Sequence, residues 1–253
     1  MCLIACAYRC HPDYPLILAG NRDEFHGRPT ADAAPWPDAP QVVGGRDLEA
    51  GGSWLALSGR GRLAGGTNVR RMAQPLPGAP SRGALVADFV RGEARAADAA
   101  VALLDRAPAY AGFNLLLWDG DTLEYVSNRP TPRHTTLPPG VYGLSNDALD
   151  TPWPKLLRLR AAMQAVADGK RHIDTLFTAL ADPRPAADAE MPNTGVGAPM
   201  ERLLSSPFIR DARYGTRAST VVTVPAHGAA RLVERRFGPE GRPLGESTLE
   251  APQ

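Results

Sequence analysis

The sequence predicts an α+β protein whose strands pair as antiparallel hairpins. Short apolar runs separated by polar turns occur near both ends of the chain, and helical patterns fill much of the middle. No regular alternation of strand and helix is present. Such alternation would indicate a parallel sheet, whereas hairpins indicate antiparallel sheets.

The composition indicates a globular chain without a charged binding surface. It has 253 residues, 28 Lys and Arg against 27 Asp and Glu, and 43% hydrophobic residues. A chain of this length buries about 75% of its unfolded surface, which suffices for a core without disulfides. The near-zero net charge argues against nucleic acid as a partner. We expect one domain over residues 1–253, with a polar tail from about residue 238.

The first elements are two hairpins separated by a loop. Apolar runs over Cys2–Tyr8 and Leu16–Ala19 flank a His-Pro-Asp turn and predict the first hairpin. Residues 26–52 are rich in Gly, Pro and Asp, and we expect a long structured loop there. Gly51–Leu57 and Leu63–Thr67 predict the second hairpin.

Helices and further hairpins follow. Ser81 is a suitable N-cap for a helix over 82–91, and Pro154 opens a helix to about Ala167 with Leu156, Leu159 and Met163 on one face. The other expected elements are a helix over Glu93–Arg106, a hairpin of Phe113–Trp118 and Thr122–Ser127, a strand over Val141–Leu144, helical pieces near 171–181 and 199–206, and a hairpin of Ala218–Val224 and Arg231–Phe237.

The cysteines and the apolar runs bear on location and cofactors. All three cysteines lie in the first ten residues, which favours free thiols in the reducing cytoplasm. The start of the chain lacks a basic segment, and no apolar run is long enough to span a membrane. Cys2, Cys6 and Cys10 lie about 13 Å apart in an extended strand, too far for one metal ion. We therefore expect no metal and no cofactor.

Cys2 is the first candidate for catalysis. Removal of the initiator methionine would give Cys2 a free α-amine beside its thiol. That amine has an unperturbed pKa of about 7.7–8.0, and an N-terminal amine can serve as the base for a nucleophile on the same residue. The alternative is a small buried hydrophobe at the start of a strand.

The charged segment after the second apolar run strengthens the functional alternative. A turn near Pro12 makes paired residue numbers sum to about 25, which places Cys2 opposite Arg22 and Asp23. An arginine there would favour the thiolate, and a carboxylate could orient the amine or the arginine. The alternative is a solvated strand end with local ion pairs, a reading that suits Glu24 best.

Three loop residues could contribute to a site. Asn68 follows Gly65-Gly66, where the backbone can approach a ligand closely, and its amide could donate to an oxyanion. Asn146 lies in a similar segment. Both could equally be turn residues that cap their own backbone. Arg217 could clamp a carboxylate or polarise an acyl group, or be an exposed arginine at the start of a strand.

Several motifs, taken in order, resemble the NRDE family, which includes the transport and Golgi organisation protein 2 homologues. They are Met1-Cys2, Asn21-Arg22-Asp23-Glu24-Phe25 with Arg28-Pro29, Gly51-Gly52-Ser53-Trp54-Leu55, Thr67-Asn68-Val69-Arg70, Ser81-Arg82-Gly83, Tyr142-Gly143-Leu144-Ser145-Asn146, Leu149-Asp150-Thr151-Pro152-Trp153-Pro154-Lys155 and Tyr214-Gly215-Thr216-Arg217-Ala218-Ser219-Thr220. Each is weak alone, but their order over residues 1–237 is specific. Ala218 departs from the serine found in many relatives.

The resemblance implies a four-layer αββα fold of the N-terminal-nucleophile hydrolase type, distantly similar to the choloylglycine hydrolase and penicillin V acylase group. By position, that group's catalytic residues correspond to Cys2, Arg22, Asp23, Asn68, Asn146 and Arg217. Other side chains of the matching motifs, namely Asn21, Glu24, Trp54 and Arg70, are candidates for binding substrate.

Three functions follow from these observations. The first is a cysteine amidohydrolase or acyltransferase that acts on a non-peptide C–N bond of a small molecule. The second is a carrier for haem or an acyl-type ligand, since eukaryotic relatives are linked to Golgi organisation and haem trafficking. The third is a scaffold with a decayed site. Fold alone does not choose among them, and the substrate and oligomeric state stay open.

Overall fold

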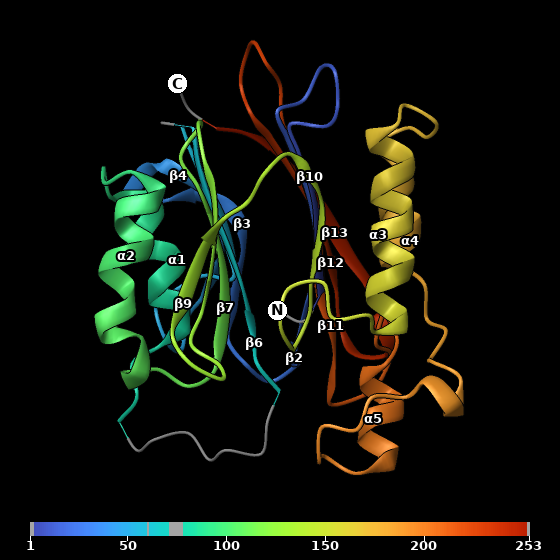
Figure 1. The fold of residues 1–253 in the computed structure, drawn as a ribbon. Coiled ribbons are helices and arrows are strands. Elements are labelled where there is room, and N and C mark those ends of the chain that lie inside the picture. Colours follow the sequence, from blue (N-terminus) through green and yellow to red (C-terminus); the bar gives the residue numbers. More distant parts are fainter. Residues whose placement is uncertain (1–2, 60, 71–77, 252–253) are drawn as a thin grey trace.

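Two antiparallel sheets face each other, and helices cover the outer face of each (Figure 1). The computed structural model describes residues 3–59, 61–70 and 78–251. Helices α1 and α2 lie outside one sheet, and α3 and α4 lie outside the other. The layers therefore run helix, sheet, sheet, helix, and the predicted α+β fold of four layers is confirmed.

The first sheet combines strands from both ends of the chain, whereas the second consists of consecutive strands. The first sheet has the order β10 (Gly140–Leu144), β1 (Leu3–Tyr8), β2 (Leu16–Phe25), β11 (Tyr214–Val224), β12 (Arg231–Phe237), β13 (Pro243–Glu250). The second has the order β3 (Thr30–Trp36), β4 (Ala39–Asp47), β5 (Leu55–Ser58), β6 (Arg62–Asn68), β7 (Phe113–Trp118), β8 (Leu123–Ser127), β9 (Arg133–Thr136). Because β2 pairs with β11, the two ends of the chain meet in one sheet.

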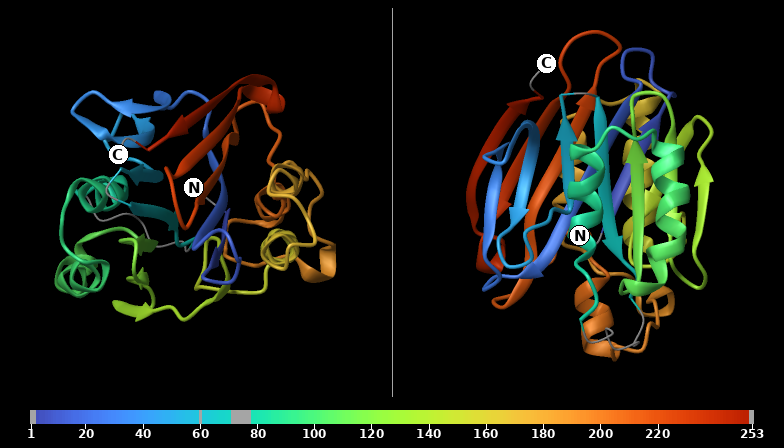
Figure 2. Two further views of the ribbon diagram at one scale, coloured as in Figure 1. Left: turned by 90° about the horizontal axis from the view of Figure 1, so that it is seen from above. Right: turned by 90° about the vertical axis from the view of Figure 1, so that its left-hand side faces the viewer.

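The helices are short, and most cover a sheet. They are α1 (Arg82–Arg91), α2 (Ala96–Arg106), α3 (Pro154–Ala167), α4 (Thr175–Leu180) and α5 (Ala198–Leu204), with single 3₁₀ turns at Ala107–Ala109, Asp188–Glu190 and Pro239–Gly241. Views from above and from the side show the helices on opposite outer faces (Figure 2). In the described ranges, none of them has the length and apolar character of a membrane span.

Three apolar layers hold these elements together. One lies between the sheets and contains Ile4, Leu18, Leu57 and Trp118. The other two lie between each sheet and its helices. Strand β1 contributes alternate residues to two of these layers, so every one of its side chains is buried. This explains its continuous apolar sequence, since a strand covered on both faces has no solvent-facing positions.

The predicted hairpins and the helix caps are found close to the expected bounds. β1 and β2 form the first hairpin, β5 and β6 the second, β7 and β8 the third, and β11 and β12 the last. The Ser81 side chain caps α1 by accepting a hydrogen bond from the Gly83 amide, at 3.2 Å. Helix α3 begins at Pro154 and ends at Ala167, as expected.

The prediction of a loop over residues 26–52 is wrong. β3 and β4 form a hairpin in this region, and its register shifts twice, between Ala31 and Ala34 and between Pro35 and Trp36. β3 is an edge strand, which explains why it can contain Pro35. The glycines and prolines that indicated a loop therefore belong to an irregular edge hairpin.

The polar tail from residue 238 also has structure. Pro243–Glu250 form β13, an edge strand that pairs with β12 over most of its length. Most of its side chains are exposed, so backbone hydrogen bonds hold it and no apolar pattern is needed. This explains why hydrophobic periodicity could not predict the strand.

A close contact between two glycines sets the position of α1. A Cβ atom on Gly52 would lie 2.3 Å from the carbonyl carbon of Gly83 and 2.7 Å from its Cα. The two backbones therefore touch, and the Ser53 amide donates to the Gly83 carbonyl at 3.1 Å. This contact brings the first turn of α1 against the segment that precedes β5.

We expect Gly52→Ala to destabilise the protein by about 1–3 kcal/mol, because the added methyl must displace backbone. Urea unfolding followed by circular dichroism would measure the change. Gly27→Ala is the matched control, since nothing lies within 4 Å of a Cβ at that position. Equal stability of the two variants would contradict the inferred contact.

Candidate functional site

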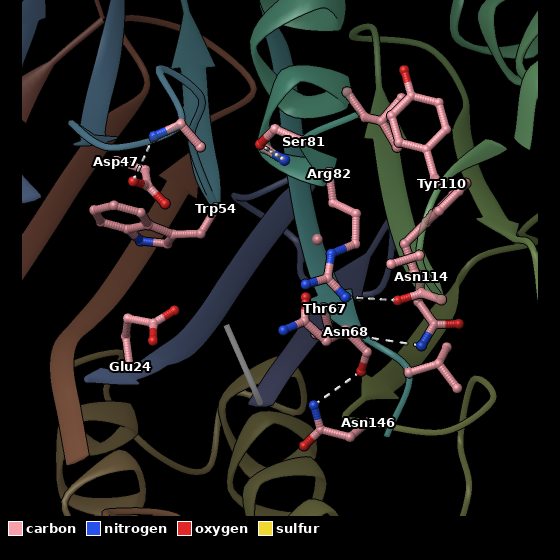
Figure 3. A pocket seen from close by; sticks show the side chains of 18 of the residues that line it. Glu24, Asp47, Trp54, Thr67, Asn68, Ser81, Arg82, Tyr110, Asn114 and Asn146 are labelled. Atoms are coloured by element: carbon pink, nitrogen blue, oxygen red, sulfur yellow. Dashed lines mark hydrogen bonds between the residues drawn. The ribbon is translucent and has the colours of Figure 1, made fainter. Parts of the chain in front are cut away.

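A cavity of about 950 Å³ opens where the ends of β2, β6 and β7 meet the first turn of α1. Figure 3 shows Glu24, Asp47 and Trp54 on one side of it, and Asn68, Asn146, Arg82 and Asn114 on the other. Its apolar lining includes Trp54, Leu85, Val86, Tyr110, Phe113, Leu115, Met200 and Leu204. Of the predicted site residues, Arg22, Glu24, Trp54, Asn68, Arg70 and Asn146 line it.

The register of the first hairpin agrees with the predicted geometry to within one residue. Leu3 pairs with Asn21, so paired residue numbers sum to 24. Cys2 itself lies outside the described residues. Arg22 is therefore the next residue of β2 after Asn21, the partner of Leu3.

Alternation along β2 separates its polar side chains. Even-numbered residues such as Leu18 face the other sheet, whereas Ile17 and Ala19 face the helices. Arg22 is on the same face of β2 as Leu18 and lines the cavity. Asn21 is on the same face as Ile17 and Ala19, and its amide donates to two backbone carbonyls, those of Leu180 and Pro207, each at 2.8 Å.

Asp23 also lies away from the cavity lining. Its Oδ1 accepts a hydrogen bond of 2.6 Å from the Thr216 hydroxyl, and the residue is buried. Asn21 is held in a similar way, because the Ser219 hydroxyl donates to its Oδ1 at 2.7 Å. Both side chains thus connect β2 to β11.

Arg22 is a buried cation inside the cavity. It is 3% exposed, and its guanidinium carbon lies 4.4 Å from the centre of the Trp54 ring, within cation–π range. Within the described residues its Nη1 has no hydrogen-bond partner. Burial lowers the pKa of Arg22, because a cation is poorly solvated there. Such a group is suited to stabilise an anion in the cavity.

The mouth of the cavity carries a network of ion pairs around Arg28. The Arg28 Nε lies 2.8 Å from Asp47, and its Nη1 lies 2.9 Å from Glu49. Glu24 is farther away, at 4.0 Å. Burial alone would raise the pKa of Asp47, but the hydrogen bond and charge of Arg28 lower it. Glu24 therefore belongs to the rim of the cavity.

The two candidate asparagines differ in their bonding. The Asn146 amide donates to the Asn68 carbonyl at 2.9 Å (Figure 3), and its Oδ1 accepts from Arg70 Nη2 at 2.9 Å. The Asn146 side chain is therefore engaged at both ends. Among the described residues, no hydrogen bond involves the Asn68 carboxamide. Asn68 is the asparagine that can donate to a ligand.

Arg70 and Arg217 are both engaged with the protein. Arg70 lines the cavity and contacts Asn146 and Glu201. Arg217 occupies a bulge of β11, between the pairs that Thr216 and Ala218 make with β2. Its Nη1 donates to the carbonyls of Phe25, at 2.8 Å, and Arg28, at 3.2 Å. It does not line the cavity and instead holds the turn that follows β2.

Sequence reasoning missed Asn114, a buried amide that lines the cavity. Its Nδ2 donates to the Asp147 carbonyl at 2.8 Å, and the Tyr125 hydroxyl donates to its Oδ1 at 2.8 Å. An asparagine within the apolar run Phe-Asn-Leu-Leu-Leu-Trp is a detectable signal, because a buried amide needs partners. Arg82 also lines the cavity and was not among the predicted site residues.

The described residues contain no candidate metal site. In residues 3–59, 61–70 and 78–251, no group of three or more His, Cys, Asp or Glu side chains is arranged to hold an ion. Cys6 and Cys10 are free thiols, and burial raises the pKa of Cys6 to about 12.

Comparison with known structures places the fold. A Caenorhabditis elegans N-acylethanolamine-hydrolyzing acid amidase (NAAA) ortholog superposes with a TM-score of 0.52, covering 87% of this chain and 92% of the other. The two sequences are 11% identical, so the likeness concerns the fold. That fold is the N-terminal-nucleophile hydrolase type expected from the sequence.

Comparison of sequences shows closer relatives. The chain is 35% identical over 259 residues to the transport and Golgi organization 2 homolog of Mus musculus, covering 93% of this chain and 92% of that protein. It is 34% identical to the Homo sapiens homolog, with the same coverage, and 30% identical to the Drosophila melanogaster protein, covering 92% of this chain and 91% of that protein. The family profile described as Transport and Golgi organisation 2 matches residues 1–239, and the chain belongs to this family.

Proposed function

We propose that the protein is a cysteine N-terminal-nucleophile hydrolase that cleaves a non-peptide amide of a small molecule, with Cys2 as nucleophile. The observation that carries this proposal is Arg22. It is a buried cation in the cavity, its Nη1 is without a hydrogen-bond partner in the described part of the chain, and it follows the residue paired with Leu3. A thiolate on Cys2, the residue that precedes Leu3 in the sequence, would be an anionic partner for this Nη1.

The reaction has two steps. After removal of Met1, the Cys2 sulfur attacks the amide carbonyl carbon, and the thiol proton passes through the α-amine to the leaving nitrogen. The C–N bond breaks, the amine leaves, and a thioester remains. Water then attacks the thioester, which releases the acid and restores the thiol. In an acyltransferase, a second nucleophile would replace this water.

The surrounding residues stabilise the developing charges and orient the reacting groups. Asn68 donates its amide to the developing oxyanion, the kind of interaction that stabilises acyl-transfer transition states. Arg22 stabilises the thiolate, and Asp23 orients the N-terminal residue from the outer face of β2. Asn146 and Arg217 support the site through the loops that they bind.

The substrate-binding assignment is part of the same proposal. Trp54 offers an apolar face, and Glu24 lies at the rim, where it can contact a polar group of the substrate. Arg70 contributes to the floor, and Asn21 supports β2 from behind. An amide substrate agrees with the structural neighbour, which is described as hydrolysing N-acylethanolamines.

A second candidate function is a carrier for an acyl-type ligand in the same cavity. The apolar wall of Leu85, Val86, Phe113 and Leu115 favours it, because an acyl chain would bury apolar surface there. A haem carrier would need axial ligands, and the described lining offers Met200, Tyr110 and Tyr214. A carrier keeps its affinity in Cys2→Ala, whereas a hydrolase loses turnover.

We also propose that the protein acts in the cytoplasm. Cys6 and Cys10 are free in the structure, which agrees with a reducing compartment. The names of the relatives refer to transport and Golgi organisation.

An acyl-type electrophile is expected to modify one site per chain, the N-terminal Cys2, in protein that has lost Met1. Intact-mass analysis before and after reaction measures both features. Cys2→Ser should react far more slowly, and Cys10→Ser should react like the wild type. Rapid modification of protein that retains Met1 would overturn the mechanism, because an amide nitrogen cannot act as the base.

Arg22→Gln should raise the pH at which labelling of Cys2 is half-maximal by about 1–3 units. A nearby cation stabilises the thiolate and lowers the thiol pKa, so its removal raises that pKa. Arg46→Gln is the matched control, because Arg46 also stacks on a tryptophan, 4.6 Å from the Trp36 ring, and does not line the cavity. An unchanged pH profile in Arg22→Gln would remove Arg22 from the mechanism.

A further inference from the structure

The end of β6 and the segment that follows β10 are joined by hydrogen bonds beside the cavity. The Thr67 hydroxyl donates to the Ser145 carbonyl at 2.5 Å. The Asn146 amide donates to the Asn68 carbonyl at 2.9 Å, and the Arg70 backbone amide donates to the Asn146 carbonyl at 2.6 Å. Since β6 and β10 belong to different sheets, these bonds fix one sheet relative to the other where Asn68 faces the cavity.

One guanidinium extends this connection to the opposite wall. Arg70 Nη2 donates to Asn146 Oδ1 at 2.9 Å, and Nη1 donates to Glu201 Oε2 at 3.3 Å. The group also lies 5.2 Å from the Trp153 ring centre. The side chains of Arg70 and Glu201 are 11% and 4% exposed, so water screens this ion pair weakly.

Glu201 connects Arg70 to the segment that forms the cavity wall. Its Oε1 accepts hydrogen bonds from the Thr194 amide, at 2.5 Å, and the Thr194 hydroxyl, at 2.6 Å. Val196, Met200 and Leu204, from the same stretch of chain, line the cavity. Burial alone would raise the pKa of Glu201, but the Thr194 bonds and the Arg70 charge lower it, so the carboxylate stays ionised.

We propose that Arg70 is a positioning residue of this site. Through Asn146 it sets where the Asn68 carboxamide points, and through Glu201 it holds the wall of residues 194–204 in place. The inference rests on the proposed function, in which Asn68 binds the oxyanion. It replaces direct substrate binding as the role of Arg70, because both of its terminal nitrogens are already bonded to protein.

The geometry requires an arginine. A planar guanidinium presents two terminal nitrogens in fixed directions, whereas a lysine ammonium is a single point charge. Arg70→Lys keeps the charge opposite Glu201 but cannot hold Asn146 at the same time. Glu201→Gln keeps the contact between Arg70 and Asn146 but removes the ion pair. The two variants therefore test the contact of Arg70 with Asn146 and its contact with Glu201 separately.

Saturation kinetics of Cys2 labelling by an acyl-type electrophile test the contact between Arg70 and Asn146. We expect Arg70→Lys and Asn146→Ala each to lower the maximal rate by about 10- to 100-fold, with little change in the half-saturating concentration. Deleting an oxyanion donor outright lowers the rate by about 100- to 1000-fold. We expect a smaller loss here, because Asn68 itself is still present. The double variant should be no slower than the slower single variant, because both act on Asn68.

Loss of the ion pair between Arg70 and Glu201 should change the labelling kinetics in a different way. Glu201→Gln should raise the half-saturating concentration more than it lowers the maximal rate, since it loosens the wall. Arg158→Lys is the matched control for all variants, because Arg158 pairs with Asp182 at 3.0 Å and does not line the cavity. Labelling of Arg70→Lys and Asn146→Ala at the wild-type rate would overturn the inference while the proposed function stands.

Backbone hydrogen exchange tests the inference without chemistry. Peptides covering residues 64–70 and 140–150 should exchange faster in Arg70→Lys and Glu201→Gln than in the wild type, and by a larger factor than peptides elsewhere in the two sheets. If wild-type Cys2 proves unreactive, the proposed function fails, and exchange alone decides on Arg70. Unchanged exchange would overturn the positioning role, even if labelling slows, because Arg70 would then act on the substrate directly.

Discussion

The architecture depends on burying both faces of the central strands. β1 and the first part of β2 carry apolar side chains toward the facing sheet and toward α3 and α4. An uncompensated polar group in either layer would cost free energy. In β2 the run of apolar side chains ends before Asn21, and the polar residues Asn21 to Glu24 follow it. The position of the cavity is a consequence of where the apolar sequence ends.

Much of the fold follows from the sequence because its hairpins are local. The turn Asp-Gly-Asp between β7 and β8, the Ser81 cap and the Pro154 start are each set by a few neighbouring residues. β3 and β13 were not predictable in this way. β3 contains register shifts and a proline, and β13 is held by backbone bonds to β12 with exposed side chains. Neither has the periodicity by which a strand is normally detected.

Some of the residues named from the sequence line the cavity, but the contacts that they make could not be predicted. The position of Arg22 next to the partner of Leu3 was predictable, because the register of that hairpin depends on a single turn. The distinction between Asn68 and Asn146 depends on contacts between residues about 78 positions apart, which no local pattern encodes. The same holds for Arg70, whose partner Glu201 comes from α5. Asn114 could have been found, since its amide interrupts an apolar strand.

The alternation of side chains along β2 also limits how this chain can change in length. A strand repeats every two residues, so inserting or deleting one residue between Leu16 and Asn21 would exchange the faces of Arg22 and its neighbours. The guanidinium would then point at the helices, and a carboxylate or an amide would enter the cavity. The turn between Arg9 and Pro15 carries no such restriction. Within the first hairpin, length variation that keeps the site intact is therefore expected in that turn, because the length of β2 fixes which side chains face the cavity.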